Sequence, residues 1–532
     1  MVPLLGTREF TTLPDSLQAI YNTNIITYTA PETGFTYLLN VLFLVPVLAC
    51  LGVAWMLRYT MLGRGLYAIG GDKNAARVAG FNVRRLQFFA YTFSGVLTGA
   101  TAMMYTVLMH SSTTSALMGD EMIVIAACVI GGVRITGGHG GVLGVVLGVV
   151  LITLVQNNLN MLGIPTSWQT FVVGLIILLG TVITSWQAKR SSQRNMKTTK
   201  TTPAVPALKK KGLKPDTHIT VLLSMMAFVL LLMAVLKPGS YFTISNLRSM
   251  IFQFPEYGVL SFGMMICMIA GGIDLSLVGI MNLSGVAAAL IITNMGGTNA
   301  SIVLGCAAAL VVGAICGALN GFIIASLSIP AMLVTLCSLQ LYPGLALAIT
   351  GGPAINNMPD AFKNIANGSI GPIPYVLFIF IAVALGMAFI MNCTVFGNEI
   401  YFLGSNARAA RYSGINTLRV TVMTHMLSGI LGGISGILIT SHLNSAKSSN
   451  GSTYTLLTLL IIVLGGVHPD GGKGKVMGVT LSVLLLQLIA NAFTIMRAPD
   501  TFKTFVNGCL LVAALILDVV LEKRAAKKAA KS

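Results

Sequence analysis

The stretch Ile219-Thr-Val-Leu-Leu-Ser-Met-Met-Ala-Phe-Val-Leu-Leu-Leu-Met-Ala-Val-Leu236 contains no charged side chain. A helix of about 20 mostly apolar residues is long enough to cross the hydrocarbon core of a bilayer. A run of this length and composition therefore predicts a membrane-spanning helix. Similar runs recur along the whole chain, so the same argument applies to most of the sequence.

The apolar runs fall into two groups separated by a polar segment. The first group is Tyr37–Leu57, Leu86–Met109, Glu121–Val133, Gly141–Leu159 and Phe171–Trp186. The second group is Ile219–Leu236, Met250–Gly271, Val278–Thr293, Ile302–Ser326, Ala331–Ile349, Pro374–Met391, Val420–Thr440, Leu456–Val467, Val476–Phe493 and Phe502–Leu521. We expect an all-α, polytopic transmembrane helical bundle of about 15 helices, in which short runs such as Glu121–Val133 are half-helices or re-entrant segments.

The amino-acid composition is typical of a protein that is surrounded by lipid. Of the 532 residues 55% are hydrophobic and only 9% are charged, whereas a soluble domain carries roughly 25% charged residues. The chain has 33 Lys and Arg against 15 Asp and Glu. These basic residues lie between apolar runs, where membrane topology and anionic lipid account for them, so no nucleic-acid partner is expected.

The basic segments set the expected orientation. The polar stretch Gln187–Asp216 and the tail Lys523–Lys531 are rich in lysine, and such segments stay on the cytoplasmic side. An odd number of spans then places the N-terminus outside and the C-terminus inside. We expect a multi-pass protein of the bacterial inner membrane.

The chain repeats itself. Gly63-Arg-Gly-Leu-Tyr-Ala-Ile-Gly70 matches Gly397-Asn-Glu-Ile-Tyr-Phe-Leu-Gly404, an offset of 397 minus 63, or 334 residues. The same offset relates Gly131-Gly-Val133 to Gly465-Gly-Val467 without a gap. Nothing before the linker resembles Thr217–Gly351. We therefore expect residues 1–186 to be the C-terminal half of a first unit with about 5 spans, 187–216 to be a basic cytoplasmic linker, and 217–532 to be a complete second unit with about 10 spans.

The first motif is Gly404-Ser-Asn-Ala-Arg-Ala-Ala-Arg-Tyr-Ser-Gly-Ile-Asn416, with a repeat at Gly70–Asn82. A polar capping residue, a short alanine-rich stretch and a closing glycine encode a short capped helix. Such a helix in a cytoplasmic loop can dock into a groove on another protein. The alternative is an ordinary interfacial helix with arginines on the cytoplasmic side.

The second motif is Gly271-Gly-Ile-Asp274-Leu-Ser276, which lies between apolar runs. A carboxylate at membrane depth is costly, so it marks a cap, an ion pair or a pathway. Asp274 and Ser276 are candidates for capping a broken helix or for contacting a solute. Further candidates for a pathway are Asn320, Gln487 and Asn491, which equally suit hydrogen bonding between helices.

A glycine-rich motif occurs twice, at Gly131–Gly140 and Gly465–Gly474. A phosphate-binding Walker loop needs G-x-x-x-x-G-K-[ST], and neither copy has it. We therefore expect no bound nucleotide and no other cofactor, and we interpret the glycines as tight turns and close helix contacts. The histidines and the eight single cysteines show no metal-ligand spacing, so the sequence predicts no metal site and no catalytic residue.

Together these motifs resemble the ribose-type family of bacterial ABC sugar-importer permeases, which includes permeases for ribose, xylose, galactose, rhamnose and autoinducer-2. The residues that carry the resemblance are Gly271–Ser276, Asn320-Gly321, Ile329-Pro330, Thr335-Leu336, Thr350–Gly352, Gly404–Asn416 and Gly465–Gly474. They cover essentially all of 217–523. The first unit resembles only the C-terminal half of such a permease.

The resemblance implies that two permeases form the pathway, that cytoplasmic ATPase subunits dock on coupling helices, and that a periplasmic binding protein delivers the sugar. It implies that the coupling helices carry the residues Gly70, Asp72, Ala75, Ala76, Arg77, Gly80, Gly404, Asn406, Ala409, Ala410, Arg411, Ser413 and Gly414. The first copy departs from the family pattern at Asp72 and Ala79, and the glycine after Asp274 comes one residue late, at Gly279.

Three other functions stay open on sequence alone. The first is the related permease type for branched-chain amino acids, which would use a different binding protein. The second is a secondary transporter or channel that works without an ATPase. The third is a relic without transport activity, which the missing front half of the first unit motivates.

Overall fold

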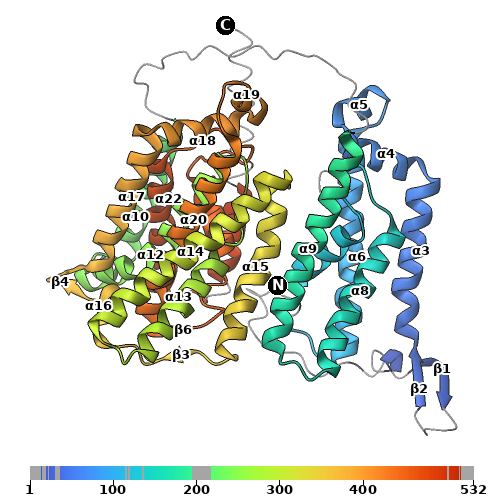
Figure 1. Ribbon diagram of the computed structural model, residues 1–532, viewed down its shortest axis with the longest axis horizontal. Coiled ribbons are helices and arrows are strands. Elements are labelled where there is room, and N and C mark those ends of the chain that lie inside the picture. Colours follow the sequence, from blue (N-terminus) through green and yellow to red (C-terminus); the bar gives the residue numbers. More distant parts are fainter. Residues whose placement is uncertain are drawn as a thin grey trace. The chain divides into compact units, whose positions relative to one another are not determined.

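The computed structural model describes residues 14, 19–21, 23–29, 36–113, 117, 120–134, 137–193, 217–499, 502–513 and 516 (Figure 1). The described chain forms two compact units, Met1–Asn157 and Asn158–Ser532. The predicted tail Lys523–Lys531 and residues 194–216 of the predicted linker lie outside the described residues.

The first unit begins with an antiparallel hairpin of β1 (Asn24–Thr29) and β2 (Thr36–Asn40), in which Thr29 pairs with Thr36. Its helices are η1 (Val41–Phe43), α3 (Leu44–Tyr59), α4 (Met61–Gly71), α5 (Lys73–Val78), α6 (Val83–Met109), α7 (Asp120–Ile130) and α8 (Val142–Met161), the last of which runs across the unit boundary.

The second unit is larger and almost wholly helical. Its first half contains α9 (Thr166–Gln193), α10 (Thr217–Leu236), α11 (Pro238–Tyr241), α12 (Ile244–Ile269), α13 (Leu277–Asn294), α14 (Asn299–Leu327), α15 (Ala331–Thr350) and α16 (Asp360–Asn367). Its second half contains α17 (Tyr375–Cys393), α18 (Val395–Ser405), α19 (Ala407–Tyr412), α20 (Thr417–Leu443), α21 (Tyr454–Leu464) and α22 (Val476–Ile495). Two short strand pairs join loops, β3 (Ile355–Asn356) with β6 (Ser445–Ala446) and β4 (Ser369–Ile370) with β5 (Ile373–Pro374).

Among the described residues, 11 helices are long and apolar enough to cross a membrane. Three shorter apolar helices accompany them, at Trp168–Val182, Tyr454–Leu464 and Phe502–Ala513. Together with the short helix α7 they make up the predicted bundle of about 15 helices, so the all-α polytopic fold is confirmed. The runs predicted to be half-helices are short, since α7 and α21 each have 11 residues.

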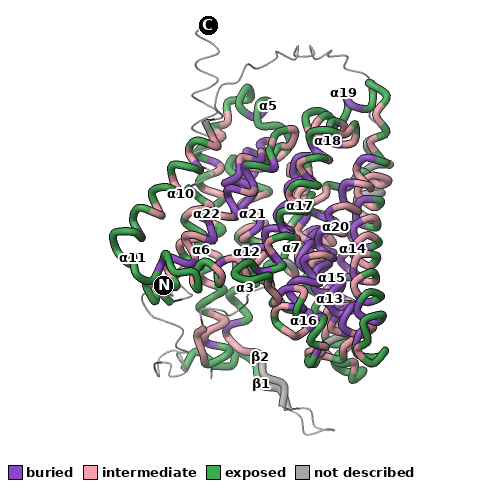
Figure 2. Tube along the Cα trace, turned by 90° about the vertical axis from the view of Figure 1, so that its left-hand side faces the viewer, coloured by how far each residue is buried: buried purple, intermediate pink, exposed green. Residues whose placement is uncertain are grey.

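The core of the second unit lies around α12, which packs against α17, α20, α21 and α22. Residues Val259 to Ile269 of α12 are almost fully buried, and Figure 2 shows buried residues concentrated along α12, α20 and α21. Helices α14 and α20 pack closely, and Gly313 and Gly429 bring the two backbones into contact. Small residues allow this approach because they leave no side chain between the helices.

The repeat seen in the sequence is also a structural repeat. Six helical elements of the first unit begin and end at residues that lie 334 positions before the ends of six helices in the second unit. In chain order, the span Val41–Tyr59, α4, α5, α6, α7 and α8 correspond to α17, α18, α19, α20, α21 and α22. A hydrogen bond repeats as well. Tyr67 donates to the Gly140 carbonyl at 2.7 Å, and its repeat partner Tyr401 donates to the Gly474 carbonyl at 2.8 Å. The first unit thus has the secondary structure of residues 375–495.

Candidate functional site

The two repeated loop motifs each form a short helix with the same cap. In α5 the Asp72 carboxylate accepts from the N–H groups of Asn74 and Ala75 at 2.7 and 3.0 Å. In α19 the Asn406 side-chain oxygen accepts from Arg408 and Ala409, both at 3.0 Å. Each cap satisfies two donors that the first turn of a helix leaves without partners.

The two short helices also end alike. Gly80 and Gly414 have positive φ angles of 89° and 85°, a conformation that favours glycine after a helix. Their N–H groups donate to the carbonyls of Arg77 and Arg411, both at 3.1 Å. The predicted capped helices are therefore present in both copies; their role in coupling stays a prediction.

Each short helix is held by one alanine and exposes the rest of its surface. Ala76 and Ala410 are 2% and 1% exposed, whereas the predicted residues around them face outward. The exposed set is Asp72, Ala75, Arg77, Gly80, Asn406, Ala409, Arg411, Ser413 and Gly414. At the end of the second unit's bundle, α19 therefore offers a small exposed surface (Figure 1).

Sequence reasoning missed the most prominent apolar residue on each short helix. Val78 is 90% exposed and its repeat partner Tyr412 is 92% exposed. An exposed apolar side chain next to an arginine at the end of a helix is suited to a groove on a partner protein. The signal was available, because position 78 and position 412 are the apolar residues of otherwise small or charged helices.

Glycines fix the position of the helix that leads into each motif. A Cβ atom at Gly404 would clash with the Ile269 carbonyl at the end of α12, and one at Gly70 would clash with the Gly138 backbone. In the second unit the Gly472 N–H also donates to the Ile269 carbonyl at 2.8 Å. The glycine-rich loop therefore forms tight turns and close contacts, which agrees with the interpretation from sequence. Through it, α12 is in direct contact with the helix that carries α19.

The two caps differ in charge. The N–H groups of Ala75 and Asn74 hold the pKa of the Asp72 carboxyl below its usual value. Because the folded-state pKa is lowered, the cap stabilises α5 fully at pH values above the unfolded-state pKa of about 3.9. This stabilisation is lost as the pH falls through the lowered folded-state pKa. Asn406 does not titrate, so the cap of α19 is independent of pH.

The predicted residues Asp274, Ser276 and Asn320 form one buried network. Asp274 accepts from the Ser276 N–H at 3.1 Å and from the Ser276 hydroxyl at 2.5 Å, and its other oxygen accepts from Ser428 at 3.1 Å. Asn320 donates to the Ser276 hydroxyl at 2.9 Å and accepts from Ser338 at 2.7 Å. Asp274 thus lies two residues before the N-cap of α13, and its network links this end of α13 to α14, α15 and α20. Its capping role stays a prediction.

The other two pathway candidates lie elsewhere, between α22 and α12. Gln487 accepts from the Tyr257 hydroxyl at 2.5 Å, and Asn491 exchanges two hydrogen bonds with Asn246 at 2.8 and 2.9 Å. The structure therefore divides the five predicted pathway residues into two groups. All five bond to neighbouring helices, and their role in a pathway stays a prediction.

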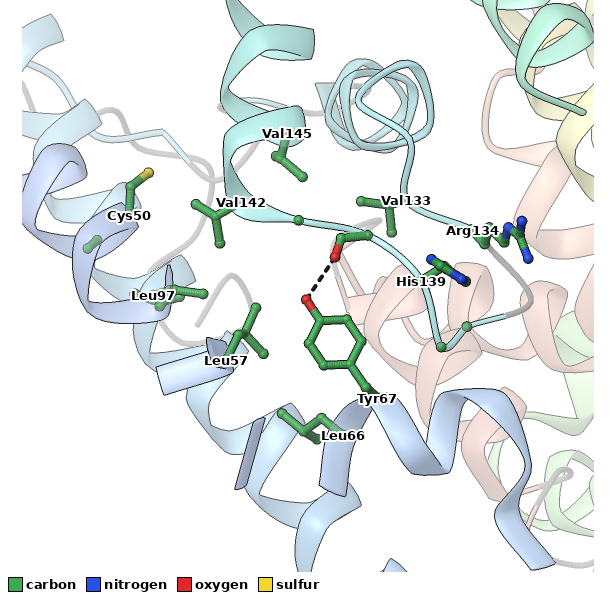
Figure 3. A pocket seen from close by; sticks show the side chains of 16 residues that line it. Cys50, Leu57, Leu66, Tyr67, Leu97, Val133, Arg134, His139, Val142 and Val145 are labelled. Carbon is green, nitrogen blue, oxygen red and sulfur yellow. Dashed lines mark hydrogen bonds between the residues drawn. The ribbon is translucent and has the colours of Figure 1, made fainter. Parts of the chain in front are cut away.

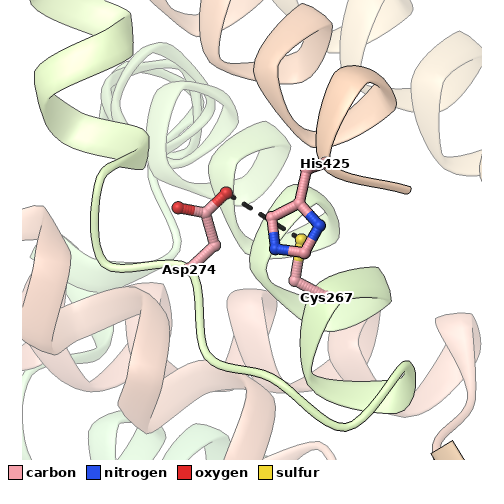
Figure 4. A group of neighbouring side chains, drawn as sticks. All are labelled: Cys267, Asp274 and His425. Carbon is pink, nitrogen blue, oxygen red and sulfur yellow. Dashed lines mark hydrogen bonds between the residues drawn. The ribbon is translucent and has the colours of Figure 1, made fainter. Parts of the chain in front are cut away.

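Three residues at the Asp274 network have side chains of the kinds that coordinate metal ions. The ligand atoms of Cys267, Asp274 and His425 lie within 4.8 Å of one another, and all three residues are buried (Figure 4). His425 Nδ1 contacts the Thr421 carbonyl at 2.9 Å, and its Nε2 has no hydrogen-bond partner among the described residues. Cysteine, carboxylate and histidine suit Zn²⁺, but both Asp274 oxygens already accept hydrogen bonds. Sequence spacing gave no hint of this group because His425 is far from Cys267 and Asp274 in the chain.

A second buried carboxylate was not singled out from the sequence. Glu256 in α12 is 3% exposed. One of its oxygens is hydrogen-bonded to His442 Nδ1, and the other accepts from the Tyr454 hydroxyl at 2.9 Å. Tyr454 is the first residue of α21, so this hydrogen bond links α12 to α21. A lone glutamate inside the apolar run Met250–Gly271 was the available signal.

The comparisons with known proteins agree with this architecture. The family model described as "Branched-chain amino acid transport system / permease component" matches residues 6–180 and 246–515. The L-arabinose transport system permease protein of Escherichia coli K12 is 30% identical over 57% of this chain and 90% of its own length. The ribose import permease protein of the same strain is 30% identical over 56% of this chain and 92% of its own.

A third relative is the autoinducer 2 import system permease protein of Yersinia pseudotuberculosis serotype O:1b, which is 30% identical over 52% of this chain and 78% of its own length. No solved structure matches the chain. The two regions of the family match and the 11 candidate spans agree with a multi-pass protein of the inner membrane. The chain belongs to the family of branched-chain amino acid transport system permease components.

Proposed function

We propose that this chain is the membrane-spanning permease subunit of a bacterial ABC importer for a monosaccharide-like solute. The observation that carries the proposal is the pair of short helices α5 and α19, with matching caps, matching glycine ends and exposed surfaces. Relatives of the same family are named as import permeases for L-arabinose, ribose and autoinducer 2. These solutes favour a sugar-like substrate over a branched-chain amino acid.

In the proposed mechanism separate ATPase subunits bind α19 and α5, and a periplasmic binding protein delivers the solute. ATP-driven closure of the ATPases pushes on the coupling helices and shifts the permease between outward-open and inward-open states. The close contact of Gly404 with the end of α12 transmits the push to the core of the bundle. The chain itself carries out no chemical step, and a second permease copy completes the pathway within membrane lipid.

One observation favours a second candidate. Glu256 is buried and hydrogen-bonded to the partly exposed His442, and carboxylate and histidine side chains inside the membrane occur in the proton relays of transporters. A secondary transporter would use this pair, would need no ATPase, and would respond to a proton gradient. Carboxylates are scarce in the apolar runs, which disfavours a proton relay, but Glu256 is one carboxylate inside such a run.

Charge reversal on α19 tests the docking role. We expect Arg411→Glu to weaken ATPase binding about tenfold, equal to about 1.4 kcal/mol, because Arg411 is exposed beside Tyr412 at the tip of the helix. Binding is measured with the purified chain and its ATPase subunit. Arg497→Glu is the matched control, since Arg497 is exposed at the opposite end of α22 from the glycine-rich loop.

Two results would count against the assignment. Arg411→Glu could leave both ATPase binding and solute-stimulated hydrolysis unchanged, in which case α19 is an ordinary interfacial helix. Alternatively, Arg497→Glu could weaken binding as much as Arg411→Glu, in which case the effect reports overall charge.

A further inference from the structure

A group of three metal-binding side chains lies in the core of the second unit. The ligand atoms of Cys267, Asp274 and His425 lie within 4.8 Å of one another, and no other such group occurs among the described residues. The three residues are 0%, 0% and 2% exposed. Figure 4 shows the imidazole beside the sulfur, with the carboxylate to one side. An ion placed among these atoms would be enclosed by protein.

The His425 imidazole has one nitrogen that is free to bind an ion. Its Nδ1 lies 2.9 Å from the Thr421 carbonyl oxygen, and a carbonyl oxygen only accepts, so Nδ1 carries the proton. In the neutral ring Nε2 then has a lone pair, yet it is buried and has no hydrogen-bond partner among the described residues. A buried polar atom without a partner is costly. Histidines that bind metals donate their other N–H to a carbonyl or carboxylate in the same way.

The spacing of the other two side chains suits a tetrahedral ion. The Cys267 Sγ lies 3.9 Å from Asp274 Oδ2. Bonds of about 2.3 Å to sulfur and about 2.1 Å to oxygen place two ligands of a tetrahedral Zn²⁺ about 3.6 Å apart. The Ser428 hydroxyl, one turn of α20 after His425, lies 3.1 Å from the same Asp274 oxygen and can complete the coordination.

The hydrogen bonds of Asp274 leave room for an ion. Asp274 Oδ1 accepts both hydrogen bonds from Ser276, which orients the carboxylate as an outer-shell partner does at a metal site. Oδ2 accepts from Ser428 and keeps a second lone pair, since each carboxylate oxygen has two. The weak contact from the Cys267 thiol disappears when the thiol gives up its proton to bind a metal.

The charge of Asp274 also favours a cation. The residue is 0% exposed, and among the described residues no basic side chain forms an ion pair with it. An ionised carboxylate without a compensating charge is costly to bury. A divalent ion bound by this carboxylate, the Cys267 thiolate and a neutral His425 would bring the net charge of the group to zero.

The pocket of the first unit does not offer a comparable set of ligands. It has a volume of about 460 Å³, and its lining contains one cysteine, Cys50, and one histidine, His139, but no acidic residue. In Figure 3 these two side chains lie on opposite sides of the pocket. His139 is exposed and Cys50 is partly exposed. Both the ligand types and the burial therefore single out the group around Asp274.

We propose that Cys267, Asp274 and His425 bind a divalent transition-metal ion, with Zn²⁺ as the best match, where α12, α13 and α20 meet. Thiolate and imidazole ligands suit Zn²⁺, whereas Mg²⁺ and Ca²⁺ take oxygen ligands. Binding releases the thiol proton of Cys267 to solvent. The exposed Gly271 and the partly exposed Ile273, close before Asp274 in the chain, give the ion a route of entry. The bound ion joins the end of α12 to α20.

Metal binding by the full chain tests the proposal. The chain is purified in detergent, stripped with a chelator and titrated with Zn²⁺, and bound metal is measured by mass spectrometry after gel filtration. We expect one tightly bound Zn²⁺ per chain, and with Co²⁺ as the probe a thiolate-to-cobalt charge-transfer band in the near ultraviolet. Cys267→Ser and His425→Leu should each lower Zn²⁺ affinity by at least about 100-fold, the upper end of what loss of an outer-shell partner costs.

Cys316→Ser is the matched control, because Cys316 is a buried cysteine of α14 outside this group. It should keep both the affinity and the cobalt band. The proposal is overturned if the unchanged chain retains no Zn²⁺ or shows no thiolate band with Co²⁺, and these two results do not depend on how the variants fold. Unaltered metal retention by folded Cys267→Ser would also overturn it, since the ion would then be adventitious. Metal content and spectrum are independent of transport, so failure here leaves the proposed function untouched.

Discussion

Gly429→Leu should unfold the second unit, while Gly95→Leu should leave the chain folded. A side chain at Gly429 would overlap the Gly313 carbonyl on the facing helix. The Gly313 carbonyl belongs to the α14 backbone and an added Cβ is fixed to the α20 backbone, so the clash is relieved only if α14 and α20 separate. Overpacking a well-packed core costs about 1–3 kcal/mol or more. We expect the upper end or beyond here, because the two backbones are already in contact.

The measurement is the thermal unfolding temperature of the purified chain in detergent. A second measurement is the resistance of the second unit to protease. Gly95 is the control because it occupies the repeat position of Gly429 and has no neighbour within 4 Å of an added Cβ. Equal unfolding temperatures for Gly429→Leu and the unchanged chain would contradict the packing described. A collapse of Gly95→Leu would show instead that any leucine at this repeat position disrupts the helix.

Asp274→Leu should cause the second large loss of stability. The change removes the acceptor for the Ser276 N–H, the Ser276 hydroxyl and the Ser428 hydroxyl, all of them buried. A buried donor without a partner costs about 1–3 kcal/mol, so three such donors destabilise the network by about 3 kcal/mol or more. Thermal unfolding in detergent is again the measurement.

Asp274→Asn is the matched control, because the amide oxygen can still accept from Ser276 and the amide N–H can donate to Ser428. If Asp274 acts as a cap, the asparagine variant should stay folded and transport its solute. If it stays folded and loses transport, the charge itself takes part in the pathway or binds a cation with Cys267 and His425. Unchanged stability of Asp274→Leu would refute the capping role.

The fold class was predictable because apolar runs of about 20 residues have few other solutions. The repeat was predictable too, since Gly63–Gly70 and Gly397–Gly404 share a gapless offset that the helix ends reproduce. The two capped helices followed from local rules for caps, which act within a few residues of Asn406 and Gly414. In each of these cases the determining contacts are close in sequence.

What could not be predicted depends on contacts between distant residues. Cys267 and His425 come together only because α12 and α20 pack side by side. Asn320 and Ser276 are 44 residues apart, and Glu256 and His442 are 186 residues apart. Sequence alone showed Gln487 and Asn491 as polar residues in apolar runs, without their partners Tyr257 and Asn246.

ATP-driven uptake tests the central claim most directly. The chain is reconstituted in proteoliposomes with its ATPase subunits, a second permease copy and a periplasmic binding protein, and uptake of labelled ribose, L-arabinose or autoinducer 2 is measured with and without ATP. We expect uptake of one of these solutes only when ATP and the ATPase are both present. Uptake by the chain alone, driven by a proton gradient and insensitive to ATP, would contradict it.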